Sequence, residues 1–200
     1  YVGERANRRH KPGRAFERTG YRFDVLSDYG AFRDLQRHRM LTIEWQALTP
    51  AHGYDVPEPV LEAGEEAAFT KAMDVSAALY GALAFRFPEQ ASYAVALAYR
   101  LRYVMQMNAR EAMHLIELRS QPQGHESYRR VAQDMHRAIA EVAGHRYPFT
   151  PVNVIESTKC RWPSRNTTRS GPVTRTFAAI RAAHSVWCTP WYVVRPSCSV

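Results

Sequence analysis

Apolar and polar residues alternate in one early segment, residues 21–27 (YRFDVLS), which is also rich in β-prone side chains. This pattern predicts a strand. Asp28, which follows, is a suitable N-cap for a helix over residues 30–38. In that helix Phe32, Leu35 and Gln36 would face inward. The run MLTIEWQAL at 40–48 is then expected to be extended, with Leu41, Ile43 and Trp45 on one side.

Four helices are predicted after a loop at 49–60, which holds three prolines and a glycine. We expect them at 62–85, from 89 to about 107, at 108–120 and at 126–143. The first repeats apolar residues at intervals of three and four, and the last has the clearest apolar stripe. The members of the two stripes are Phe69, Met73, Ser76, Tyr80 and Leu83, and Tyr128, Val131, Met135, Ile139 and Val142.

The character of the chain changes twice. Residues 1–20 are basic and polar, and we expect a loop that is either a solvated arm or an anion-binding one. Residues 21–147 carry the periodic segments and form the expected domain. Residues 148–200 contain no helical or strand period, so they are expected to be a disordered, non-globular tail or an out-of-frame translation of the end of a gene.

The net charge of +8 suggests nucleic-acid binding, but the distribution of charge argues against it. Seven of the 27 Lys and Arg lie at 157–200, where no acid occurs, so residues 1–156 carry 20 basic against 19 acidic residues. No nucleic-acid partner is therefore expected. No run of eighteen apolar residues occurs, so no membrane association is expected either.

The cysteines, Cys160, Cys188 and Cys198, all lie late in the chain. Their odd number and position give little support to a disulfide framework. The absence of cysteine from the body fits a reducing cytoplasm, which is the predicted location. Because the chain begins with Tyr1, we expect it to be part of a longer protein.

Arg37, His38 and Arg39 stand side by side, and three potentially cationic groups in a row repel one another. We therefore expect either an anion or abundant water beside them.

The predicted helix at 108–120 offers a second polar group. Arg110, His114 and Glu117 are four and three residues apart, so they are expected to share one face. Asn108 stands at the N-terminus, where free backbone N–H groups favour anions, and Arg119 stands near the other end. A solvated helix face and a wall that presents Asn, Arg and His to a ligand both fit this spacing. No glycine-rich phosphate loop, metal-ligand spacing or nucleophile elbow competes, and no metal is expected.

RHRMLT at 37–42 and NAREAMHLIELR at 108–119 together resemble the signatures of the flavin-dependent thymidylate synthase family. The resemblance covers roughly residues 21–144. It implies an α+β fold with a sheet flanked by long helices, four subunits, and FAD at the subunit junctions. It implies an enzyme that methylates dUMP to dTMP, with methylene-tetrahydrofolate and NADPH as co-substrates. Since such a site is shared, its residues would look exposed and unpaired in one chain.

The resemblance also assigns roles to residues. The residues that would contact FAD are Arg37, His38, Arg39, Asn108, Arg110 and His114. Those that would contact dUMP are Arg37, Thr42 and Arg119. Of these, Arg119 matches the catalytic arginine that sits on the uracil base and favours its ionised form.

Several positions depart from the family pattern in a consistent way. Trp45, Ala47 and Thr49 stand where the family has Glu, Ser and Arg, and Asp34 stands where a Gln is usual. Ser92 falls where a further phosphate-binding Arg is expected. These losses remove groups that would hold the dUMP phosphate, while the flavin-facing residues remain.

Three hypotheses follow. The chain is a working synthase with an altered nucleotide site, or a degenerate half of a tandem protein that binds flavin and supports assembly. The third hypothesis, a basic nucleic-acid-binding protein, is opposed by the near-neutral body.

Overall fold

The computed structural model describes residues 9–145 and 197–199, and its centre is an antiparallel sheet in the order β2-β3-β1-β4. The strands are β1 (Gly20–Asp28), β2 (Leu41–Trp45) and β3 (Arg100–Asn108), with a short β4 (Ser197–Ser199). β1 pairs with β3 along its whole length, from Gly20 opposite Asn108 to Asp28 opposite Arg100. The predicted strands at 21–27 and within 40–48 are confirmed.

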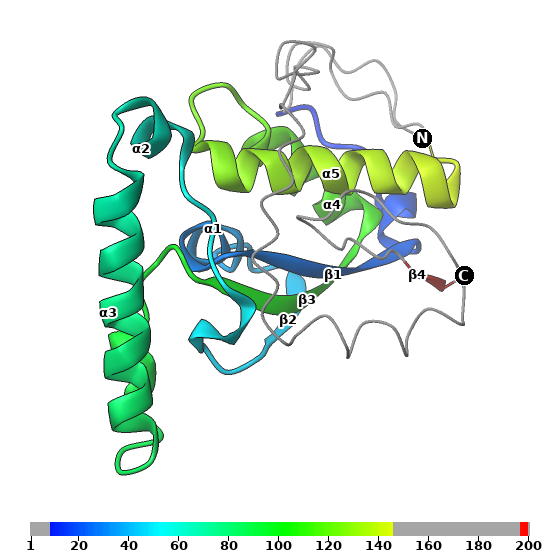
Figure 1. The fold of residues 1–200 in the computed structure, drawn as a ribbon. Helices are drawn as coiled ribbons and strands as arrows, with labels where there is room; N and C mark the ends of the chain where they lie inside the picture. The colour runs from blue at the N-terminus through cyan, green and yellow to red at the C-terminus, as the bar shows by residue number, and fades with distance from the viewer. Residues whose placement is uncertain (1–8, 146–196, 200) are drawn as a thin grey trace.

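Three helices cover one face of this sheet: α1 (Tyr29–Leu35), α4 (Ala109–Arg119) and α5 (Glu126–Ala143) (Figure 1). Alternate residues of the strands face them and form the main core together with apolar residues of the helices. The strand members of this core are Tyr21, Phe23, Val25, Leu101, Tyr103, Met105 and Met107. The α+β class is thus confirmed.

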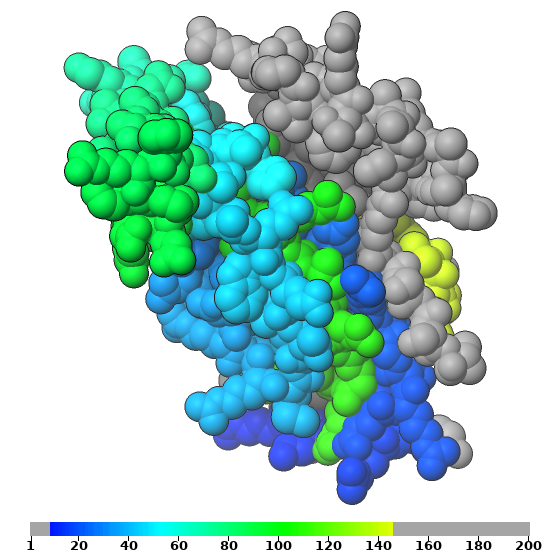
Figure 2. Space-filling model, turned by 90° about the horizontal axis from the view of Figure 1, so that it is seen from below, coloured from blue at the N-terminus to red at the C-terminus, as the bar shows by residue number. Residues whose placement is uncertain are grey.

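The other face of the sheet carries mostly polar side chains. Arg22, Asp24, Arg102 and Gln106 alternate with the buried strand residues, and Arg102 forms an ion pair with Asp24. Figure 2 looks onto this side of the molecule, where the blue and green segments that contain β1 and β3 lie side by side.

A second, smaller core lies beside the sheet, under the long helix α3 (Glu66–Ala84). The predicted inward stripe of α3 is confirmed, since Met73 is buried and Phe69, Ser76, Tyr80 and Leu83 are partly buried. The helix packs on η3 (Ala91–Ala94) and follows α2 (Glu58–Glu62). The expected single helix at 62–85 is in fact interrupted at Gly64, whose φ of 73° is left-handed and ends α2.

The predicted helix from 89 to about 107 is wrong. Only the short η3 forms there, and from Arg100 onward the chain becomes β3, one of the two strands of the sheet with a neighbour on each side. Its Leu, Arg, Gln and Met residues favour helices intrinsically. Buried Leu101, Tyr103 and Met105 alternate with partly or fully exposed residues, which is the strand period, and pairing with β1 and β2 outweighs the local preference.

Within the basic lead-in, η1 (Arg14–Glu17) forms a short 3-10 helix, and Phe16 packs against the main core. Most of the expected tail at 148–200 lies outside the described residues, so its disorder stays a prediction. In the described part of the chain, every helix is too short or too polar to cross a bilayer.

Candidate functional site

The Arg-His-Arg motif lies in the turn between α1 and β2. Asp28 caps α1 as predicted, because its Oδ1 accepts a hydrogen bond from the backbone N–H of Ala31 at 2.7 Å. Buried Phe32 and Leu35 fix the helix on the core, and the helix ends at Leu35. The turn that follows leaves Arg37 and Arg39 exposed and places His38 in the interior.

The second motif lies on α4, of whose eleven residues seven are buried. Asn108 caps this helix by accepting a 2.9 Å hydrogen bond from the N–H of Glu111. His114 is the most exposed residue of α4, while Glu117 is only 2% exposed. Arg110, His114 and Glu117 do align along α4, but they do not form one polar face open to solvent or a ligand, because Glu117 is buried and Arg110 pairs with Glu17 of η1.

The two motifs meet around one cavity of about 230 Å³. Its walls are the turn after α1 and the side of α4 on which residues three, four and seven apart align. The lining residues are Arg37, His38, Arg39, Met40, Glu111, His114, Leu118 and Arg119. Five predicted site residues, Arg37, His38, Arg39, His114 and Arg119, are thus brought together, although they lie up to 82 residues apart.

His38 is the most tightly held group of this pocket. Its Nδ1 lies 3.0 Å from Oε1 of Glu111, and the two side chains are only 5% and 9% exposed. Its Nε2 accepts a 3.1 Å hydrogen bond from Nε of Arg119. The ring also packs edge-on against that of His114, with centroids 5.8 Å apart. The expectation of an unpaired His38 is therefore wrong.

Arg119 is held on several sides. Its Nη2 donates to the backbone carbonyl of Asp34 at 2.7 Å, and its Nη1 lies 3.6 Å from the Asp34 carboxylate. Its guanidinium also lies over the ring of Tyr128, 5.2 Å from the centroid. Asp34, which departs from the family pattern, thus contacts the arginine that the resemblance identifies as catalytic.

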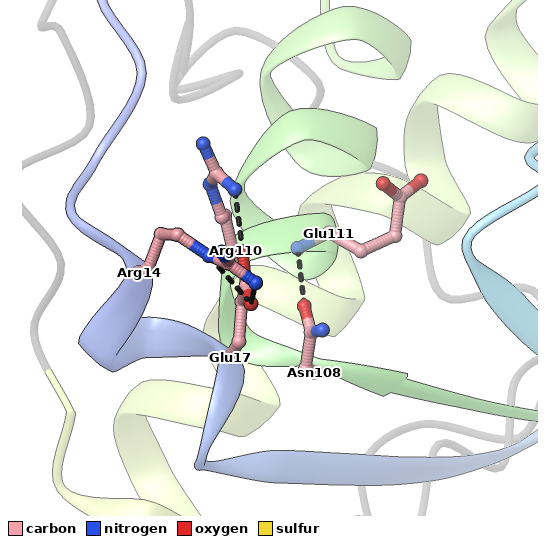
Figure 3. Close-up of polar contacts among 5 residues, drawn as sticks. All are labelled: Arg14, Glu17, Asn108, Arg110 and Glu111. Carbon is pink, nitrogen blue, oxygen red and sulfur yellow. Dashed lines mark hydrogen bonds and ion pairs between the residues drawn. The ribbon is translucent and has the colours of Figure 1, made fainter.

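Asn108 and Arg110 lie outside the pocket lining. Figure 3 shows Arg110 pointing to Glu17 of η1, with Nη1 of Arg110 2.6 Å from Oε1 of Glu17, while Arg14 contacts the same carboxylate. Hydrogen bonds from Arg14 and Arg110 hold the pKa of Glu17 below its ordinary value. An internal carboxylate therefore takes the place that the sequence analysis assigns to a ligand.

Thr42 is also separated from the pocket. It lies on β2 opposite Gln106 and is exposed on the sheet face that α4 and α5 leave open. Trp45, on the same strand, is 58% exposed, and its ring packs on Phe32 with centroids 5.5 Å apart. In one chain, neither Thr42 nor Trp45 reaches the pocket.

Sequence reasoning missed Glu111, Met40 and Leu118 as lining residues. Glu111 lies three residues after Asn108, the spacing of a capping box, which would direct its carboxylate back to the start of its own helix. Its contact with His38 therefore had no signal in the sequence. Met40 and Leu118 lie within the two motifs, but as apolar residues they carried no chemical signal that distinguished them from core residues.

A flavin fits this site in part. The exposed Arg37 and Arg39 and the neighbouring Arg119 suit an anionic group, against Glu111 as the acidic residue of the lining. However, about 230 Å³ is below the roughly 300–1,000 Å³ of sites for drug-sized ligands, and FAD is larger than these. A cavity of this size in one chain could therefore hold only part of an FAD molecule. Among the described residues, no cluster of His, Cys, Asp and Glu could hold a metal ion.

Comparison with known proteins places these motifs in a family. The family model of thymidylate synthase complementing protein matches residues 4–144, which include η1 and both motifs. A UPF0159 protein of Chlamydia muridarum (strain MoPn / Nigg) is 48% identical over 140 residues, 70% of this chain and 26% of that protein. A UPF0159 protein of Chlamydia pneumoniae is 44% identical over 140 residues, with the same coverage.

A UPF0159 protein of Thermoplasma acidophilum is 43% identical over 143 residues, 69% of this chain and 28% of that protein. The chain thus spans about a quarter of the length of these relatives. The family match covers the complete pocket and the whole described core. The chain belongs to the thymidylate synthase complementing protein family.

Proposed function

We propose that the pocket between the Arg-His-Arg turn and α4 binds FAD, and that the chain serves the methylation of dUMP to dTMP. Methylene-tetrahydrofolate and NADPH are the proposed co-substrates. The observation that carries the proposal is the convergence of Arg37, Arg39 and Arg119 on one cavity with His38 and His114. Family membership supports the same reaction class.

The residues of the pocket have different proposed roles. Arg37 and Arg39, which are exposed and reach solvent, would hold the anionic part of the cofactor through charge-assisted hydrogen bonds. His114 offers a ring at the mouth of the cavity, and Arg119 offers a guanidinium edge to the uracil base. When bound, the flavin supplies hydride for the reduction. Positioning of the reactants provides much of the rate enhancement in such reactions. Arg119, which its neighbours hold in place, is therefore the residue of this chain to which we assign the positioning of the base.

The remainder of the site would come from another copy of the domain. The cavity is too small for the whole cofactor, and Arg110, Asn108 and Thr42 lie outside it. A homotetramer, or pairing with another family domain of a longer protein, would bring such residues to a shared flavin and nucleotide site. The length of the relatives, about four times the matched segment, is compatible with the second arrangement.

A second candidate function is a degenerate flavin-binding copy with weak or no dUMP turnover. It is favoured by the contacts of Asp34 with Arg119, which occupy donors that the nucleotide would need. Thr49 and Ser92 also stand where the family has arginines that would hold the phosphate. Each missing charge-assisted contact costs about 1.5–3 kcal/mol. Two such losses weaken dUMP binding by about two to four decades.

The test of flavin binding is titration of the purified chain with FAD, followed by flavin absorbance and fluorescence. Arg37→Ala should weaken binding by about tenfold, since one charge-assisted contact is lost. Arg33→Ala is the matched control, because Arg33 is an exposed arginine of α1 that lies over Tyr29 and outside the pocket. Failure of the wild-type chain to take up FAD would contradict the proposal.

Calorimetry with dUMP at saturating FAD separates the two functions. Micromolar binding together with dTMP formation would support the working synthase and exclude the degenerate copy. Binding of FAD with dUMP affinity in the millimolar range would support the degenerate copy.

A further inference from the structure

The buried hydrogen-bond chain from Glu111 through His38 to Arg119 fixes the proton on His38. Arg119 has only N–H donors and no acceptor, so His38 Nε2 must carry a lone pair in order to accept the 3.1 Å bond from Nε of Arg119. The ring proton is then on Nδ1, from which it is donated to the carboxylate of Glu111 at 3.0 Å. The surroundings thus select one of the two neutral tautomers.

Each member of this chain is fixed by a different part of the fold. The backbone N–H of Glu111 donates to the capping oxygen of Asn108, which anchors Glu111 in the first turn of α4. His38 is held by the turn after Leu35, to whose carbonyl its own N–H donates at 3.3 Å. Arg119, two turns along α4 from Glu111, is held in addition by Asp34. The two sequence motifs are therefore joined by one continuous chain of hydrogen bonds.

We infer that Glu111 is a positioning residue that locks His38 in the Nδ1–H tautomer, and that His38 in turn aligns the guanidinium of Arg119 in the pocket. The hydrogen bonds from Glu111 through His38 to Arg119 require no ligand. Their importance for the reaction rests on the proposed function. A His38 protonated on both nitrogens would set an N–H against the Nε–H of Arg119. His38 therefore acts on Arg119 as a neutral acceptor and does not supply a positive charge to the ligand.

Because His38 and Glu111 are buried, the loss of either partner should change the protonation pattern of the other. With side chains only 5% and 9% exposed, His38 and Glu111 have little water to replace a lost partner. Removing the carboxylate of Glu111 would leave the contact with Arg119 as the remaining constraint on the His38 proton. The Nε2–H tautomer would then become available, and this form presents a donor to Arg119 and breaks the contact between them.

The first experiment is a ¹⁵N-resolved NMR measurement of the His38 imidazole in the full chain without flavin. We expect Nδ1 to give the shift of a protonated nitrogen and Nε2 that of an unprotonated one. Glu111→Ala should shift the ring toward the Nε2–H tautomer and change the Nε–H signal of Arg119. Glu111→Gln keeps the volume and one acceptor oxygen, so it should retain the wild-type tautomer in part. Glu44→Ala, the loss of an exposed carboxylate on β2, is the control and should change neither signal.

The second experiment measures FAD affinity of the same variants, checked for folding by circular dichroism. Glu111→Ala should bind FAD about tenfold more weakly than the wild type. Glu111→Gln should lose less affinity, in line with its smaller tautomer shift. A wild-type His38 in the Nε2–H form would overturn the inference, and so would an unchanged tautomer in a folded Glu111 variant. If the wild-type chain binds no FAD, the proposed function fails, whereas the NMR result still decides whether Glu111 positions His38 and Arg119.

Discussion

At the scale of single residues, Glu17 and Arg110 show how an internal group can occupy a predicted ligand site. The resemblance assigns Arg110 to the flavin, and the structure pairs it with Glu17 at 2.6 Å. Arg14 contacts the same carboxylate, so Glu17 lies between two cations. A bound anion near the start of α4 would have to compete with this carboxylate.

Glu17→Gln should therefore strengthen FAD binding, because it removes the negative charge that holds Arg110. We expect a gain of about twofold to fivefold, the size of a surface ion pair. Affinity is measured by fluorescence titration at neutral pH, where the lowered pKa keeps the carboxylate of Glu17 ionised. Weaker binding by the variant would indicate that Glu17 supports the site and does not compete for it.

His52 gives a pH-dependent prediction. Burial, followed by the nearby charges of Arg102 and Arg100, lowers its pKa below the ordinary value of 6.5. At pH values between the folded-state pKa of His52 and 6.5, the unfolded chain binds more protons than the folded chain. The free energy of unfolding should thus decrease as the pH falls through about 6.5 toward the folded-state pKa, and it is at its full value above 6.5.

Urea unfolding at pH 7.5 and pH 5.5 tests this, with His52→Gln as the variant that cannot titrate. The wild type should lose more stability than His52→Gln between the two pH values. The same loss in both proteins would exclude His52 as the source of the pH dependence.

At the scale of elements, α3 is apolar around most of its circumference. Its inward stripe packs on the smaller core, but a second stripe with intervals of four and three faces outward. In this stripe Val75 is 61% and Leu79 is 50% exposed, and Ala68, Ala72 and Ala82 extend the apolar surface. Exposed apolar surface of this kind is typical of a contact with another protein surface, which agrees with the proposed oligomer.

Val75→Glu should therefore shift the chain toward a smaller assembly in light scattering, without loss of helical signal. Val142→Glu is the matched control, since Val142 is 49% exposed near the C-terminal end of α5, and this end of α5 lies far from α3 (Figure 1). If the wild type and Val75→Glu form assemblies of the same size, this stripe of α3 is not part of the subunit contact.

The elements also show where local patterns suffice. α5 matches its prediction at both ends, because its apolar stripe has a clear helical period and Gly144, at a φ of 66°, ends it. β3 does not match, because its residues are good helix formers and only its pairing with two other strands makes it extended. Central strands are the elements whose structure depends most on partners distant in the sequence.

At the scale of the whole molecule, the residues of the described main core lie between Phe16 and Ala143. β4 adds only three backbone-paired residues to the edge of β1. A chain of residues 9–145 should therefore fold cooperatively and keep the helical signal expected of α3, α4 and α5. Circular dichroism and urea unfolding test this, and an unfolded or aggregated product would show that the later residues provide essential contacts.

The sequence by itself determined the family, the α+β class, most of the helices and the residue types of the pocket. These features are local: a period, a cap or a short motif is complete within a few residues. The resemblance to the family likewise rested on two short motifs, 37–42 and 108–119, and the family match confirms it.

Only the tertiary structure decided which motif residues meet. It brought Arg37, His38, Arg39, His114 and Arg119 to one pocket, paired Arg110 with Glu17, and placed Thr42 on the opposite face of the sheet. It also identified Glu111, whose role depends on His38, a residue 73 positions earlier. The physical reason is that side-chain direction and partner choice follow from how distant elements pack, and no local pattern specifies that packing.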